Sequence, residues 1–177
     1  MTAASEALYR TRQLWWAITA ALSAEQRAEV QAALPPTLYA LFCRMHRSEQ
    51  FHAYQVWSTV RASGSTPPDL TTAALLHDVG KSKLGLNLAG RISIVLGSKF
   101  APERAARWGE REPRSFYTPF VIAHRHPAWG AEMVAQAGAR PAVIWLVANH
   151  QSPPGTPPPD PTWSDWLARL VAADNEH

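Results

Sequence analysis

The chain contains almost no cysteine. Cys43 is the single cysteine among 177 residues. One thiol cannot close a disulfide within the chain, and it cannot supply the several thiolates of a cysteine-rich metal site. Its neighbours in LYALFCRM are mostly apolar, which predicts a small buried thiol.

Long hydrophobic runs and a strong charge of one sign are also missing. No apolar run approaches the roughly 18–20 residues that span a bilayer, so we predict no membrane segment. The run LWWAITAAL follows Arg10 and Arg12 but is short and contains Thr19, which favours a buried or amphipathic helix over a signal peptide. We therefore expect a cytoplasmic protein. The net charge of +3, from dispersed Lys and Arg, indicates no nucleic-acid partner and suits a small anionic substrate.

The sequence does have the composition and periodicity of a helical globular domain. Hydrophobic residues make up 46% and charged residues 18% of the chain. Apolar residues recur at helical spacing in most segments. The segment GRISIVLGSKF alternates like a strand, but a lone strand has no partner, so we assign it to a helix. These patterns predict an all-α fold of roughly seven to nine helices, with residues 1–36 as an N-terminal helical extension and 37–177 as the main domain.

Capping residues, prolines and glycines mark the predicted helix boundaries. Gly80 is predicted to stop one helix, and Pro127 to separate two others. The proline-rich residues 152–161, SPPGTPPPDP, predict a stiff loop. The predicted N-caps are Ser23, Thr37, Ser48 and either Asp69 or Thr71.

Carboxylates and imidazoles lie on or at the ends of apolar helical segments. Burying an unpaired carboxylate costs several kcal/mol, so such a set favours a bound cation. Mixed nitrogen and oxygen ligands suit first-row divalent metals. The candidate ligands are His52, His77, Asp78 and Asp174.

The strings around these residues resemble the HD superfamily of metal-dependent phosphohydrolases. LLHDVGK carries the adjacent His-Asp pair, with FHAYQV upstream and LVAADN downstream. The resemblance covers roughly residues 38–176, is of the HDIG type, and implies a compact helical HD-domain bundle. It implies metal ligands in the order His52, His77, Asp78 and Asp174. His46 also precedes the pair, but His52 shares its helix with apolar Val56 and Val60, as the first ligand of the family does.

Two further strings resemble the richer motif of the HD-GYP branch. HPAWGAEMV implies His126 as an additional ligand, and ANHQ implies His150, with Asn149 in place of the first residue of a histidine pair. Together these histidines imply a second metal. The GYP signature itself is missing, and the proline-rich loop occupies its place. The implied cofactor is one or two divalent ions from among Mn, Fe, Ni, Co, Mg and Zn.

The resemblance implies hydrolysis of a phosphomonoester or phosphodiester in a small phosphorylated substrate of the nucleotide type. Asp78 and Lys81 are the implied catalytic residues, with Lys81 directed at the substrate phosphate. Arg91 and Arg125 are candidate helpers. Two other functions stay open: a di-iron HD-type oxygenase, and a non-catalytic module that binds a nucleotide or a partner protein.

Overall fold

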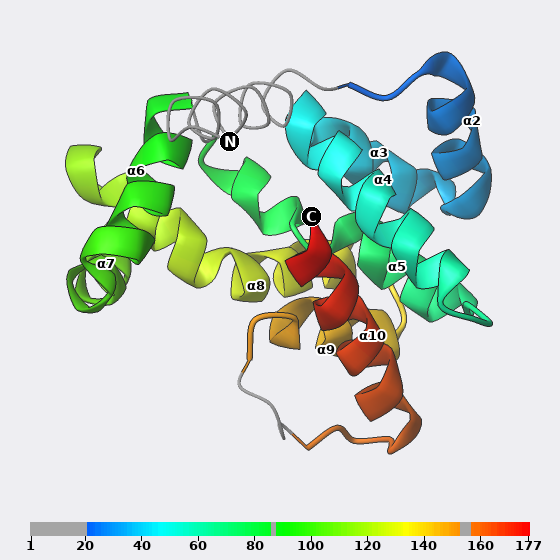
Figure 1. Cartoon of the computed structure of the whole chain (residues 1–177). Coiled ribbons are helices and arrows are strands. Elements are labelled where there is room, and N and C mark those ends of the chain that lie inside the picture. Colours follow the sequence, from blue (N-terminus) through cyan, green and yellow to red (C-terminus); the bar gives the residue numbers. More distant parts are fainter. Residues whose placement is uncertain (1–20, 86–87, 153–156) are drawn as a thin grey trace, which may run out of the picture.

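The protein is all-α, as predicted. The computed structural model describes residues 21–85, 88–152 and 157–177, in which it contains nine α-helices, two short 3-10 helices and no strand (Figure 1). The helix predicted near the N-terminus lies largely outside these residues. The elements are α2 (Ala24–Ala33), α3 (Pro36–Arg44), α4 (Arg47–Ala62), α5 (Pro68–Leu76), η1 (Val79–Lys83), α6 (Leu88–Phe100), α7 (Pro102–Gly109), η2 (Ser115–Tyr117), α8 (Thr118–Gln136), α9 (Pro141–Asn149) and α10 (Thr162–Glu176).

Helix α5 forms the centre of the core. It packs against α4, α9 and α10, and its side chains from Thr72 to Leu76 are all buried. A helix that is apolar on every side is stable only when surrounded by other helices. His77 and Asp78 directly follow α5 in the sequence, so they lie in the interior of the protein.

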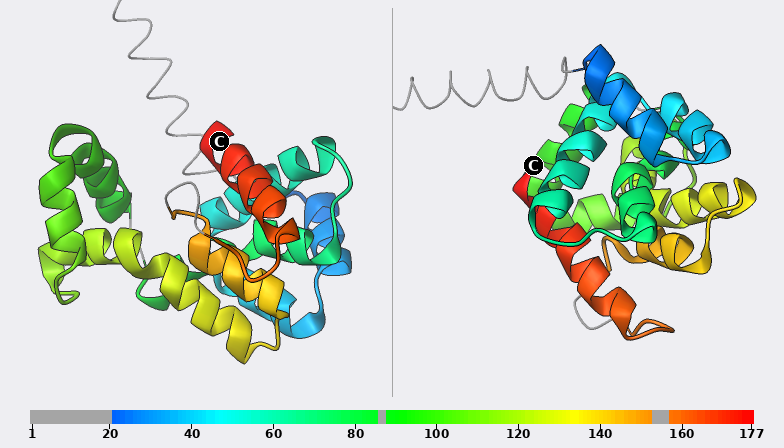
Figure 2. Two further views of the ribbon diagram at one scale, coloured as in Figure 1. Left: turned by 90° about the horizontal axis from the view of Figure 1, so that it is seen from below. Right: turned by 90° about the vertical axis from the view of Figure 1, so that its right-hand side faces the viewer.

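Helix α8 connects this core to a projecting pair of helices. Figure 2 shows α8 running out from the core to α6 and α7, which extend away from the rest of the molecule. The strand-like segment GRISIVLGSKF forms most of α6, so the helix prediction is confirmed. None of the described helices has the length and apolar character needed to cross a bilayer.

The predicted helix break at Pro127 is wrong. Helix α8 continues through this residue, although proline has no N–H for the usual bond to the carbonyl four residues earlier. That carbonyl belongs to Ala123, and it accepts a hydrogen bond from the Nδ1–H of His126 at 2.9 Å instead. The side chain of His126 thus compensates for the missing backbone donor.

One of the predicted helix caps is correct, and the others are wrong. Ser23 forms the expected cap and makes a capping box with Gln26. The next helices begin earlier than predicted, because proline is preorganised for the first helical turn and His46 caps α4 through its ring. Cys43 is exposed rather than buried. The incorrectly predicted caps are Thr37, Ser48, Asp69 and Thr71.

Gly80 does not act as a helix stop. It lies within η1, after α5 has ended at Leu76, and η1 packs against α8. A Cβ at this position would lie 2.7 Å from the backbone nitrogen of Gly130 and closer still to the carbonyl oxygen of His126. Glycine is therefore required because two backbones approach each other closely.

Gly80→Ala is expected to lower the free energy of unfolding by about 3 kcal/mol, since the clashing atoms are backbone and cannot rotate away. Chemical denaturation would measure the loss. Gly97→Ala is the matched comparison, because its added Cβ meets first the side-chain ring of Phe120 rather than backbone. Equal losses in the two variants would contradict this explanation.

Candidate metal centre

His77 and Asp78 lie at the inner end of the core helix. His77 is completely buried and Asp78 is 2% exposed. Around them the structure gathers two groups of three side chains that could each hold a metal ion. All six residues were predicted as ligands from the sequence: His52, His77 and Asp174 in one group, and Asp78, His126 and His150 in the other.

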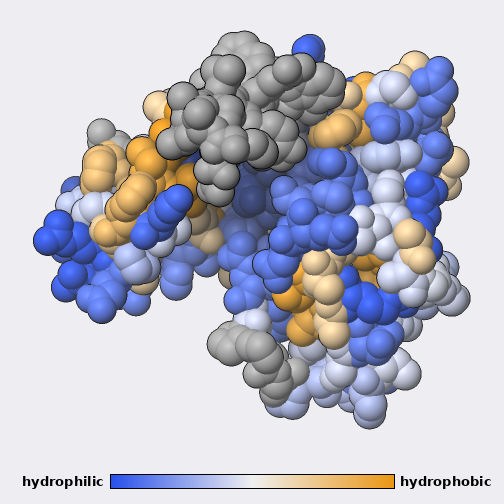
Figure 3. Space-filling model, in the orientation of Figure 1, coloured by the Kyte–Doolittle hydropathy of each residue, from blue (hydrophilic) through white to orange (hydrophobic). Residues whose placement is uncertain are grey.

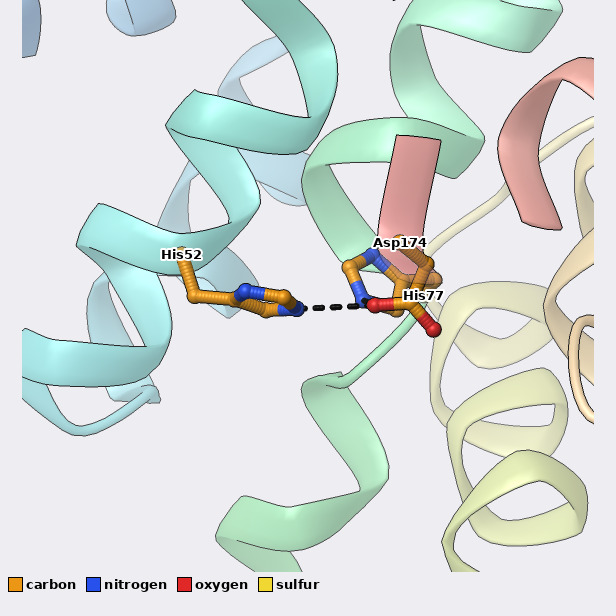
Figure 4. Close-up of side chains that lie close together, drawn as sticks. All are labelled: His52, His77 and Asp174. Carbon is orange, nitrogen blue, oxygen red and sulfur yellow. Dashed lines mark hydrogen bonds and ion pairs between the residues drawn. The ribbon is translucent and has the colours of Figure 1, made fainter. Parts of the chain in front are cut away.

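The first group joins three separate helices. His52 comes from α4, His77 from the end of α5 and Asp174 from α10 (Figure 4). Nε2 of His52 donates a hydrogen bond to Oδ1 of Asp174 at 2.9 Å. Nε2 of His77 lies 3.3 Å from the same oxygen. Residues 122 positions apart in the sequence are thereby brought within bonding distance.

The second group is more deeply buried. Nε2 of His126, from α8, lies 3.2 Å from Oδ1 of Asp78 and 3.2 Å from Nε2 of His150. Nε2 of His150, at the end of α9, lies 3.9 Å from that carboxylate oxygen. Both histidines are at most 2% exposed, so this group has little access to water.

The Asp78 carboxylate lies between the two groups. Its Oδ1 faces His126 and His150, while its Oδ2 lies 3.6 Å from Nε2 of His77 and 3.9 Å from Nε2 of His52. Each oxygen of one carboxylate therefore faces a different group. This is the arrangement that a bridging ligand between two ions requires.

Backbone contacts fix how the buried histidines present their nitrogens. Nδ1 of His77, His126 and His150 faces a backbone carbonyl at 2.8–3.1 Å. A carbonyl only accepts, so each Nδ1 carries the hydrogen, and in the neutral ring Nε2 presents its lone pair to the cluster. In metal-bound histidines the ring nitrogen that does not bind the metal typically donates such a hydrogen bond.

The residues present fit a bound divalent cation. Nε2 of His77 is buried without a hydrogen-bond partner among the described residues. The Nε2 atoms of His126 and His150 face each other at 3.2 Å, although both neutral rings present lone pairs there. A cation in each group would accept the lone pairs of these three nitrogens. Imidazole and carboxylate ligands suit first-row divalent metals.

The electrostatics of the cluster agree with this fit. Burial would lower the pKa of His77, but the carboxylates of Asp78 and Asp174 outweigh it and raise that pKa to about 9. Burial and the charge of His77 lower the pKa of His150 to about 4. Burial opposes ionisation of Asp174, yet the hydrogen bond from His52 and the close ring of His77 hold its pKa well below the usual range. Both carboxylates stay ionised at neutral pH, because the pKa of Asp78 is lowered too.

A chain of ion pairs extends from the cluster. Nζ of Lys81 lies 2.6 Å from Oδ2 of Asp78 and 3.7 Å from the buried carboxylate of Glu49, which also pairs with Arg91. Burial would lower the pKa of Lys81, but Asp78 and Glu49 raise it, so this side chain remains a cation. Sequence reasoning missed Glu49; its position three residues before His52, on the same face of α4, was the available signal.

Other candidates lie apart from the cluster. Asn149 donates to the carbonyl of Trp145 and accepts from Ser152, so its side chain completes a helix end rather than either group. His46 caps α4 and is exposed. Arg125 donates to the backbone carbonyls of Glu110 and Arg111.

Comparison with known proteins identifies the family. The HD domain family model matches residues 51–174, and the chain belongs to this family of metal-dependent hydrolases. The matched range begins just before His52 and ends at Asp174, so it contains both groups of candidate ligands. No curated protein and no solved structure matches the chain.

Pro127→Ala is expected to weaken metal binding about tenfold. The variant restores a backbone N–H that competes for the Ala123 carbonyl, which now orients the ring of His126. Titration with Mn²⁺ followed by calorimetry would measure the loss. Pro141→Ala, at the exposed start of α9, is the matched control. Unchanged affinity in Pro127→Ala would show that this carbonyl does not orient the histidine.

Metal uptake is expected to release at least one proton at pH 7. His77, with its pKa raised to about 9, holds a proton in the metal-free protein, and a metal must displace it. Affinity should therefore rise about tenfold per pH unit up to pH 9 and then level off. Calorimetry in buffers of different ionisation enthalpy counts the protons released on metal uptake; a count of zero contradicts the expectation.

The proton on His77 also affects the stability of the metal-free protein. Its contribution to the free energy of unfolding is fully present below pH 6.5 and is lost as the pH rises through 9.

Proposed function

We propose that this protein is a metal-dependent phosphohydrolase that acts on a small phosphorylated substrate of the nucleotide type. The convergence of five other candidate ligand side chains around Asp78 carries the proposal. A cavity of about 430 Å³ is lined by Asp78 and Lys81, among other residues. That volume lies within the range of about 300–1,000 Å³ found for small-molecule sites.

In this proposal the two groups would each hold one ion, and Asp78 would contribute one oxygen to each group. His52, His77 and Asp174 would hold the first ion, and His126 and His150 the second. The ions would supply Lewis acidity, which polarises a phosphoryl group and lowers the pKa of the attacking water.

The residues of the chain supply position and charge. Lys81, half-buried and cationic, neutralises the negative charge that develops on the phosphoryl oxygens. Glu49, 3.7 Å from Nζ of Lys81, is a second carboxylate that helps to fix this side chain beside Asp78. In the reaction, the water oxygen forms a bond to phosphorus, the bond from phosphorus to the ester oxygen breaks, and that oxygen leaves with a proton.

The proposal is tested by metal analysis followed by a substrate panel. Protein purified with its native metal, or reloaded with Mn²⁺, is expected to release phosphate from nucleotides or cleave a generic phosphodiester. Oxygen uptake by iron-loaded protein without phosphate release would instead favour an oxygenase. Protein that binds no metal would favour a non-catalytic module.

A further inference from the structure

The cavity beside the candidate metal centre is lined by more cations than one reacting phosphate needs. Arg44 comes from the end of α3, Arg91 from the start of α6, and Lys81 from η1. Three elements that are distant in sequence thus direct positive side chains to one space. In Figure 3 the surface is hollowed and hydrophilic here, beside the apolar face of α6.

The acidic groups of the cavity do not balance these cations. Asp78 belongs to the candidate metal ligands, so Glu49 is the one carboxylate left among the residues that line the cavity. Glu49 is 6% exposed and is shared between Lys81 and Arg91. The side chain of Arg44 makes no ion pair or hydrogen bond with the residues that the structure describes. An excess of positive charge remains, and it calls for an anionic ligand.

The type of cation indicates the type of anion. Arginine presents a planar fork of donors that matches phosphate oxygens in pairs, whereas a metal centre with Lys81 already serves the phosphoryl group that reacts. Arg91 is linked to the cluster through Glu49 and Lys81, on the side of the Asp78 oxygen that does not face His126 and His150. Arg44 lines the same cavity. The two arginines are therefore in a position to bind a second anionic group that is attached to the reacting phosphate.

We propose that this cavity is a subsite for a second phosphate group, and that the substrates are organic di- or polyphosphates, such as nucleoside diphosphates or triphosphates, rather than simple monoesters. The inference rests on the proposed function, because the position of the first phosphate is taken from it. Arg44 and Arg91 bind the second phosphate. Glu49 acts as a positioning residue that keeps Arg91 and Lys81 on the cavity wall.

The test uses two stable probes that differ by one phosphorus group, methylenediphosphonate and methylphosphonate, with the Mn²⁺-loaded full chain. Arg44→Gln and Arg91→Gln are each expected to weaken binding of methylenediphosphonate about tenfold in calorimetry. Binding of methylphosphonate should fall less than threefold, roughly. Arg91→Lys, which keeps the charge but loses the fork, should give an intermediate loss.

Arg47→Gln is the matched control. It removes the same charge from the exposed start of α4, next to His46, but Arg47 does not line the cavity. Equal losses for both probes in the cavity variants, or a loss as large in Arg47→Gln, would overturn the subsite. Folding is not an obstacle in Arg44→Gln, because the side chain is exposed.

The subsite and the proposed function can fail separately. If the binding pattern holds but no phosphate compound is hydrolysed, the function is wrong and the subsite stands. If phosphate is released but the two probes respond alike to the arginine variants, the function stands and the subsite is wrong.

Discussion

Asp78→Asn protein is expected to lose both metal ions and to release phosphate on the order of a thousandfold more slowly than the wild type. The amide retains the shape of the side chain but loses the charge that faces both groups of histidines. An amide nitrogen must also replace one of the two carboxylate oxygens, so the side chain can no longer serve an ion on each side. Elemental analysis and a phosphate-release assay would measure both effects.

Asp165→Asn provides the control for this change. Asp165 is exposed in the first turn of α10, the helix that carries Asp174, so the same substitution there removes one charge without touching the cluster. Its metal content and activity should match those of the wild type. If Asp78→Asn retained full metal content and activity, the central role given to this carboxylate would be wrong.

The second large effect concerns the number of ions. His52→Leu and His150→Leu are each expected to lower the metal content from two ions to one, because each histidine belongs to a different group. Activity should fall about a hundredfold in each, since the remaining ion cannot stabilise both the attacking and the leaving oxygen. Leucine is chosen because it fills the space of the ring but cannot ligate.

His124→Leu serves as the control for these histidine variants. His124 is exposed on α8, two residues from His126, and belongs to neither group. Its metal content should stay at two. If His150→Leu also retained two ions, the second group would not be a metal site; complete loss from either variant would show that the two ions bind only together.

The position of the cluster could be predicted from the sequence, because the hydrophobic pattern of a single short segment indicates it. An apolar segment too hydrophobic to lie at the surface ends in His77 and Asp78, so these polar side chains had to be buried together. His52 and Asp174 were added as imidazole and carboxylate groups on other apolar helical segments, and the family resemblance then added His126 and His150. The structure places them together, with no change in the residues chosen.

What the sequence could not provide was the surroundings that depend on tertiary packing. Arg91 meets Glu49 across 42 residues, and nothing in either local string indicates that pairing. The break predicted at Pro127 failed because the compensating donor is the side chain of His126, which a rule about backbone hydrogen bonds ignores. Gly80 was understood as a helix stop, but its role depends on the approach of α8.

Anomalous diffraction from crystals grown with Mn²⁺ would show directly whether Asp78 lies between two ions. We expect two manganese peaks, one on each side of the Asp78 carboxylate and roughly 4 Å apart, as in other two-metal sites. One peak should be ligated by His52, His77 and Asp174, and the other by His126 and His150. A single peak, or none within bonding distance of Asp78, would contradict the two-metal centre.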